Sequence, residues 1–237
     1  MLNPRVRAAA EALLPAFLLR ALDPFEARVA RAVAEFAASL PDGSRVLDAG
    51  AGELRYASAF ARHHYLALDM AVGDANWDYS RLSVLGDLER LPLASQSCDA
   101  ALSVVTLEHV RRPDKALEEL ARVLRPGARL LLVVPQEWEV HQAPHDFFRF
   151  TRYGLEHLVT SSGLRLLRLE PVGGYFWLMA RRSVNFLTFL QGGVKWVLFV
   201  LLAPVFGLLL PLVLYLMDGL DRQRDFTLGY ICEGEKE

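Results

Sequence analysis

Short apolar runs alternate with amphipathic segments through the middle of the chain. Four of these runs are apolar enough for buried strands. These four predicted strands cover residues 45–49, 65–68, 99–105 and 128–134. Weaker strands are predicted at 83–87 and 164–169, and helices at about 54–63, 114–124 and 151–162. Such alternation is typical of a parallel sheet with helices on both faces.

Two amphipathic segments precede the first predicted strand. Apolar residues recur at helical spacing over residues 6–18, where Pro15 bends or splits the helix. A second helix begins at Asp23, which can cap it, and Glu26 completes a capping box. We therefore predict an N-terminal helical cap over residues 1–43. Three roles are open for these helices: they cover the core, they close over a ligand, or they face a membrane. The pattern favours helices that cover the core.

The C-terminal part of the chain contains an apolar stretch of another kind. No charged residue occurs from Trp196 to Met217. A helix of that length measures about 33 Å, whereas the hydrocarbon core of a bilayer measures about 30 Å. Gly192 and Gly193 separate this half from the preceding one, 175–191, so we predict a helical hairpin over 175–220. Membrane attachment is the favoured interpretation, and a protein-buried helix pair or a dimer interface is the alternative.

Composition and charge narrow the class of protein. Of the 237 residues, 53% are hydrophobic and 23% are charged, which excludes a disordered or collagen-like chain. The 26 Lys and Arg residues do not outnumber the 28 Asp and Glu residues, so no nucleic-acid partner is expected. Cys98 and Cys232 are too few for a disulfide framework and have no metal-ligand spacing, which indicates a reducing compartment.

The first predicted strand ends in a turn that contains two glycines. Gly50 and Gly52 allow a tight turn and a close approach between backbone and ligand. Asp69 ends the next strand at about the 20-residue spacing at which a carboxylate accepts hydrogen bonds from the ribose hydroxyls of an adenosine-containing ligand. These residues together predict a nucleoside site.

The same turn disfavours a diphosphate ligand. Position 54 is leucine, and the third glycine of a dinucleotide-binding turn is absent. Glu53 places negative charge at the helix start, where a pyrophosphate would bind. A nucleoside without phosphates fits better. S-adenosylmethionine is such a ligand, and Asp48 can help hold its ammonium group directly or through water.

Five segments carry a resemblance to a known family. They are Val46-Leu47-Asp48-Ala49-Gly50-Ala51-Gly52; Tyr65-Leu66-Ala67-Leu68-Asp69; Gly86-Asp87-Leu88 with Leu91-Pro92-Leu93; Cys98-Asp99-Ala100-Ala101-Leu102-Ser103 with Leu107-Glu108-His109-Val110; and Ala121-Arg122-Val123-Leu124-Arg125-Pro126-Gly127. With them, residues 44–170 resemble the class I S-adenosylmethionine-dependent methyltransferases of the type-11 group. The departures are Leu54 and Ala128, where the family commonly has glycine.

The resemblance implies an α/β, Rossmann-like core with a seven-stranded, mostly parallel sheet. Its last, antiparallel strand is expected at 226–232, beside the strand at 164–169. The core then covers 44–174, and residues 221–237 return to it after the hairpin. A single membrane crossing would separate two neighbouring strands, so the hairpin must enter and return, or lie in the interface.

The resemblance also implies the cofactor, S-adenosyl-L-methionine, and the residues that contact it. These are Asp48, Ala49, Gly50, Gly52, Asp69, Met70, Asp87, Leu88 and Thr106, of which Asp87 faces the adenine amino group. The expected activity is methyl transfer to a small, hydrophobic or lipid- or glycan-linked acceptor. Attachment through residues 183–217 would place it at the cytoplasmic face of a membrane.

Other interpretations of the same core stay open. The chain is alternatively a soluble cytoplasmic enzyme, or a catalytically silent S-adenosylmethionine-binding or scaffold protein. A nicotinamide-dependent oxidoreductase is a third class, which Glu53 and Leu54 disfavour. Oligomerisation is compatible with the pattern but not specified by it.

The loop over residues 135–151 is rich in aromatic and titratable residues. It leaves the carboxyl end of a central strand, where open α/β sheets bind ligands. His141 and His145 are candidate general bases because an unperturbed imidazole has a pKa near 6.5, and Asp146 is a candidate orienting residue. His109, after the preceding strand, is an alternative base or a packing residue at a helix start.

Two further residues of this loop are candidates for acceptor binding. Arg149 can hold an anionic group, and Trp138 offers an apolar surface. The competing interpretation is that Asp146 caps the following turn and pairs with Arg149. His141 and His145 are also four residues apart, as some metal ligands are, but no third ligand has a clear spacing. We therefore expect no metal.

Overall fold

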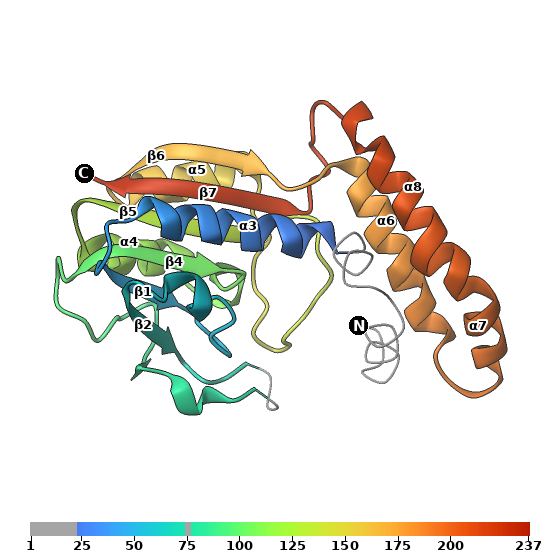
Figure 1. The fold of residues 1–237 in the computed structure, drawn as a ribbon, viewed down its shortest axis with the longest axis horizontal. Helices are drawn as coiled ribbons and strands as arrows, with labels where there is room; N and C mark the ends of the chain where they lie inside the picture. The colour runs from blue at the N-terminus through green and yellow to red at the C-terminus, as the bar shows by residue number, and fades with distance from the viewer. Residues whose placement is uncertain (1–22, 74–76) are drawn as a thin grey trace. The chain divides into compact units, whose positions relative to one another are not determined.

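The computed structural model describes residues 23–73 and 77–237 (Figure 1). The first predicted helix, over residues 6–18, lies outside the described residues. The chain forms two compact units. One contains residues 29–170 and 229–237, and we call it the core unit. The other contains the described residues up to Arg28 and Pro171–Leu228, and we call it the hairpin unit.

The core unit contains one seven-stranded sheet. Its strands are β1 Arg45–Ala49, β2 His64–Asp69, β3 Val84–Leu85, β4 Cys98–Val104, β5 Leu124–Pro135, β6 Leu164–Pro171 and β7 Gly229–Lys236. Their order in the sheet is β3-β2-β1-β4-β5-β7-β6. The pairs from β3 to β5 are parallel, and β7 is antiparallel to β5. The predicted Rossmann-like fold class is therefore confirmed, including the place of the last strand beside β6.

Helices cover both faces of this sheet. Helix α3, Pro24–Ser39, lies on one face, and helices α4, Pro113–Val123, and α5, Arg152–Ser161, lie on the other (Figure 1). The α3 cap is as predicted, because Asp23 Oδ1 accepts a hydrogen bond of 3.1 Å from the Glu26 backbone N–H. From Val29 onward, α3 belongs to the core unit.

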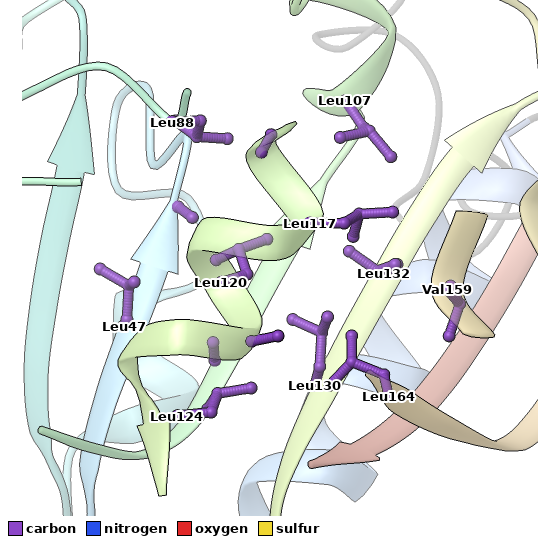
Figure 2. Close-up of a cluster of buried hydrophobic side chains, with 14 of the residues drawn as sticks. Leu47, Leu88, Leu107, Leu117, Leu120, Leu124, Leu130, Leu132, Val159 and Leu164 are labelled. Atoms are coloured by element: carbon purple, nitrogen blue, oxygen red, sulfur yellow. The ribbon is translucent and has the colours of Figure 1, made fainter. Parts of the chain in front are cut away.

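A leucine-rich cluster fills the space between the sheet and α4. Leu117 and Leu120 of α4 point toward Leu132 and Leu130 of β5 (Figure 2). All four side chains are almost completely buried. Each contributes about 1.5–3 kcal/mol by leaving water, which fixes α4 and the turn that precedes it.

The predicted helix over residues 54–63 is wrong. The structure contains only a short 3₁₀ turn there, η1 Ala57–Phe60. The physical reason is the backbone of Leu54, whose φ of 60° lies in the left-handed region that an α-helix cannot include. Leu54 thus occupies a left-handed backbone conformation that favours glycine.

The last strand is shifted from its predicted position. β7 begins at Gly229 instead of residue 226 and continues through the acidic tail to Lys236. Ion pairs across the sheet explain this extension. Glu233 pairs with Arg129 and, at 3.2 Å, with Arg168, while Glu235 pairs with Arg165 at 2.6 Å. These pairs compensate the negative charge of the tail, so it can continue the sheet.

The hairpin unit consists of two apolar helical arms. The first arm is α6 Tyr175–Phe186, continued by η4 Leu187–Leu190. The second comprises α7 Trp196–Pro204, a π-helical segment Val205–Leu209 and α8 Leu210–Met217. Gly192 and Gly193 form the bend with φ of 129° and 53°, values that favour glycine. α6 and α8 run side by side (Figure 1).

Two aspartates close the base of the hairpin. Asp218 Oδ1 accepts a hydrogen bond of 3.0 Å from the Gly174 N–H, and Asp221 Oδ2 accepts one of 2.7 Å from the Tyr175 N–H. These are the unpaired donors at the start of α6, so the second arm caps the first.

Candidate functional site

The carboxyl ends of β1, β2 and β4 meet where the strand order reverses, which is the usual ligand site of an open α/β sheet. The glycine turn after β1 is held there by the Gly50 and Ala51 N–H groups, which donate to the Leu68 carbonyl at 2.8 and 3.0 Å. Gly50 has a φ of 87°, and a Cβ atom on it would lie 2.1 Å from Thr106 Cγ2. Thr106, after β4, therefore requires glycine at this position.

Asp69 is fixed against the same turn. Its Oδ2 accepts a hydrogen bond of 3.0 Å from the Gly52 N–H, and its Oδ1 accepts one of 2.8 Å from the Ala71 N–H. A carboxylate has about four acceptor positions, so others stay available for a diol. The side chain of Met70, next in the chain, is 46% exposed. The structure thus brings Asp69 and Gly52 together, and the binding of a nucleoside by these residues stays a prediction.

Asp48 occupies a different environment from Asp69. Its side chain is buried and accepts a hydrogen bond from the Tyr65 hydroxyl. Burial raises the pKa of Asp48 to about 7; the Tyr65 hydrogen bond opposes this shift, and the nearby Asp69 charge adds to it. A cationic group beside it would favour the ionised form. Tyr65 was missed by the sequence reasoning because its hydroxyl reaches Asp48 from the neighbouring strand.

Two further predicted cofactor residues, Asp87 and Leu88, follow β3. Asp87 Oδ1 accepts a hydrogen bond of 2.9 Å from the Glu89 N–H, and Leu88 is buried. Trp77 is a further residue at the glycine turn, because its ring lies 3.1 Å from the position that a Cβ atom on Gly52 would occupy. The sequence offered no signal for Trp77, which lies outside every motif and every predicted element.

The loop after β5 is tied to the turn after β4. The Glu108 carbonyl accepts hydrogen bonds of 2.9 Å from the Phe147 N–H and 3.2 Å from the Phe148 N–H. Asp146 and Arg149 pair through both carboxylate oxygens, at 2.6 and 2.8 Å. The Arg149 guanidinium holds the pKa of Asp146 down, at about 2.

Arg149 also organises the backbone of this loop. Its guanidinium donates to the Trp138 and Glu139 carbonyls at 3.2 and 2.8 Å. The structure therefore contains the Asp146–Arg149 ion pair, which is the alternative to an Arg149 that is free to bind the acceptor. Acceptor binding by Trp138 and Arg149 stays a prediction.

The structure places two of the three candidate bases, His109 and His141, next to each other and directs the ring of His145 elsewhere. His109 and His141 face each other, with ring centroids 4.6 Å apart, and Asp146 Oδ2 accepts a hydrogen bond of 2.8 Å from the His141 backbone N–H. His145 places its backbone carbonyl against His109 Nδ1, while its ring lies edge-on to Phe147. The imidazole rings in contact are therefore those of His109 and His141, and not those of His141 and His145.

Glu108 completes the group around these two imidazoles. Its side chain is fully buried, and its Oε1 lies 3.7 Å from His109 Nε2 and 3.6 Å from His141 Nε2. Burial lowers the pKa of His141, but Glu108, the Glu139 carbonyl and Asp146 together outweigh it, so the net pKa lies above the ordinary value of 6.5. Glu108 belongs to the segment Leu107-Glu108-His109-Val110, which carries part of the family resemblance. Its proximity to His141 could not be predicted, because the two residues lie far apart in the sequence.

Comparison with known protein families yields a match that lies within the core unit. Residues 47–132 match the family model described as a methyltransferase domain, a segment that runs from β1 into β5 and includes the glycine turn, Asp69 and Asp87. Residues 47–132 therefore form a methyltransferase domain of the class I, S-adenosylmethionine-dependent type. The cofactor of the methyltransferase domain is accordingly S-adenosyl-L-methionine.

Two curated relatives show the extent of the sequence similarity. A malonyl-[acyl-carrier protein] O-methyltransferase of Methylococcus capsulatus is 39% identical over 151 residues, which are 55% of this chain and 55% of that protein. A tRNA (carboxymethyluridine(34)-5-O)-methyltransferase of Arabidopsis thaliana is 34% identical over 115 residues, which are 46% of this chain and 28% of that protein. The chain thus spans about half or less of the length of these relatives.

Two solved structures share the fold of the methyltransferase domain. The 1,6-didemethyltoxoflavin-N1-methyltransferase of Burkholderia thailandensis, with bound S-adenosylhomocysteine, has a TM-score of 0.55 at 16% identity, covering 100% of this chain and 91% of that one. The [4+2]-cyclase SpnF has a TM-score of 0.58 at 19% identity, covering 88% and 80%. At such identities the likeness concerns the fold alone.

The residues present fit the cofactor. Asp69 is held by two backbone N–H groups with acceptor positions free for a ribose diol, as its predicted role requires. Asp48 is a buried carboxylate whose ionisation a nearby cation would favour. Both acids lie at the carboxyl edge of the sheet, within the segment that matches the family.

Proposed function

We propose that this protein is an S-adenosylmethionine-dependent methyltransferase that acts at the cytoplasmic face of a membrane. Its proposed acceptor is a small hydrophobic or lipid- or glycan-linked molecule. One observation carries the proposal: a helical hairpin with exposed apolar side chains is inserted in the chain between two neighbouring strands of a methyltransferase sheet.

The exposed apolar side chains of the hairpin support membrane attachment. The segment Gly193–Leu220 is long and apolar enough to cross a membrane, and only 11% of its most apolar window is buried. Val194 and Leu216 are 90% and 87% exposed. A protein-buried helix pair would cover most of such residues, whereas a lipid-facing pair leaves them outward.

Chain connectivity restricts how the hairpin meets the membrane. β6 precedes the hairpin and β7 follows it, and the two strands are neighbours in one sheet. Both ends of the hairpin therefore start on the same side of the bilayer. It must enter and return, or lie in the interface, and either mode brings lipid-soluble acceptors near the enzyme.

The proposed chemistry divides the site into a donor side and an acceptor side. When bound, S-adenosylmethionine supplies an electrophilic methyl group. Asp69 holds the ribose, and Asp48 provides negative charge for the ammonium end. The loop over residues 136–151, tied to Glu108, forms the acceptor side beside Thr106 and the glycine turn. Alignment of acceptor and methyl group in this geometry supplies much of the acceleration.

Labelled methyl transfer tests this proposal. The full-length protein is incubated with methyl-labelled S-adenosylmethionine and either a lipid extract or a lipid-free soluble extract. We expect label in the lipid fraction with the wild type and a loss of most label with Asp69→Ala. Asp114→Asn, an exposed position on α4, serves as the matched control. Label only in soluble molecules refutes the acceptor proposal. Cofactor binding without transfer to either extract favours the silent binding protein.

A further inference from the structure

Three side chains at the carboxyl ends of β4 and β5 have buried polar atoms without partners. Glu108 is 0% exposed, and neither of its carboxylate oxygens has a hydrogen-bond partner among the described residues. Nε2 of His109 and Nε2 of His141 are also buried and unpartnered within residues 23–73 and 77–237. Leaving a buried carboxylate unpaired is costly, so this group requires a cation.

The other ring nitrogen of each histidine determines its tautomer. His109 Nδ1 lies against the His145 carbonyl, and His141 Nδ1 lies 3.2 Å from the Glu139 carbonyl. A carbonyl oxygen can only accept, so each Nδ1 must carry its proton. In the neutral rings Nε2 then has a lone pair, and both lone pairs face the Glu108 carboxylate.

When both rings are neutral, three acceptors face one another and no hydrogen bond can join them. Protonation of one imidazole would satisfy a single contact with Glu108 and leave the second Nε2 without a donor. A metal ion satisfies all three at once. Metal-binding histidines typically donate their other N–H to a carbonyl or carboxylate, which is the arrangement of both rings here.

The distances match a small coordination sphere. A tetrahedral site with bonds of about 2.0–2.2 Å places neighbouring ligand atoms about 3.3–3.6 Å apart. Glu108 Oε1 lies 3.7 Å from His109 Nε2 and 3.6 Å from His141 Nε2. The three ligand atoms all lie within 4.8 Å of one another. Closure around an ion therefore requires only side-chain adjustments.

We propose that Glu108, His109 and His141 bind a divalent transition-metal ion, with zinc the best match to two imidazoles and one carboxylate. Three protein ligands leave at least one position for water or for a hydroxyl or carboxylate oxygen of the acceptor. Thr106, two residues before Glu108, hydrogen bonds to the Gly50 carbonyl of the donor turn at 3.3 Å. The ion would thus hold an acceptor oxygen beside the donor site.

Metal content and cobalt spectroscopy test this site. The full-length protein is loaded with Zn²⁺ or Co²⁺, dialysed against metal-free buffer and analysed by mass spectrometry of the metal. We expect about one ion per chain and, with Co²⁺, the d–d absorption of a four-coordinate ion. Glu108→Gln and His141→Asn should each weaken binding at least tenfold. Glu108→Gln keeps the size of the side chain, and His141→Asn preserves a donor near the position of Nδ1.

Matched variants outside the cluster control for non-specific loss. Glu118→Gln on α4 and His157→Asn on α5 are exposed and should retain the ion. If Glu108→Gln does not fold, circular dichroism will show it, and His109→Asn replaces it in the comparison. Zn²⁺ should raise the Tm of the wild type and leave the Tm of the folded cluster variants unchanged. Equal metal content in the wild type and these variants overturns the proposal, as does the absence of a bound ion from the wild type.

Discussion

Replacing Val197 and Leu201 by lysine should release the full-length protein from lipid vesicles. These residues lie one helical turn apart on α7, and each is 65% exposed. At the centre of a membrane helix, valine or leucine contributes about −0.3 to −0.6 kcal/mol, and lysine costs about 2.5–3.5 kcal/mol. The two substitutions together therefore disfavour insertion by about 6 kcal/mol, a factor of about 10⁴ in partitioning.

Flotation with vesicles of neutral phosphatidylcholine measures this effect, because neutral lipid does not attract the added lysines. Leu85→Lys is the matched control, since Leu85 is an apolar residue of the core unit that is 69% exposed. The wild type and the control should float with the vesicles, and the double variant should stay in the dense fraction. Equal flotation of all three proteins would refute the membrane role of the hairpin. A wild type that is monomeric and soluble without detergent would refute it as well.

Three further predictions concern the donor site. Asp69→Ala should weaken S-adenosylmethionine binding about 10- to 100-fold in calorimetry, because a charge-assisted hydrogen bond contributes about 1.5–3 kcal/mol; an affinity within twofold of wild type would remove the assigned ribose contact. Gly50→Ala should lower the free energy of unfolding by at least about 2 kcal/mol in urea titrations, because its Cβ would collide with Thr106, and Gly219→Ala, in open space, should have a smaller effect. Because the folded pKa of Asp48 is about 7 and its ordinary value is 3.8, the folded chain binds more protons between these values, and stability should fall as pH rises through this window, by on the order of 1 kcal/mol per pH unit. Asp48→Asn should flatten this dependence, and an unchanged slope would contradict the assignment.

The sheet and the donor turn were predictable because their determinants are local. Apolar runs of strand length, Gly50 and Gly52 after the first run, and Asp69 at the end of the second encode them within a few residues. The parallel pairing then follows from the alternation of strands and helices. The structure confirms the predicted sheet, and the cofactor contacts of Gly50, Gly52 and Asp69 stay predictions.

The errors arose where backbone conformation or distant charges decide the outcome. Leu54 belongs to a helical pattern, but its left-handed backbone interrupts the helix, and no side-chain pattern reports a dihedral angle. The extent of β7 depends on Arg129, Arg165 and Arg168, which lie on two other strands. The proximity of Glu108 and His141 depends likewise on the adjacent ends of β4 and β5, so only tertiary structure brings them together.

The separation of β6 from β7 along the chain has a consequence for biosynthesis. During translation, the hairpin leaves the ribosome before β7, which has to pair between β5 and β6 to complete the sheet. Until that moment β5 and β6 lack the strand that joins them, and the apolar arms are already available to lipid or chaperones. If the hairpin is the membrane anchor proposed above, targeting of the nascent chain would precede completion of the sheet.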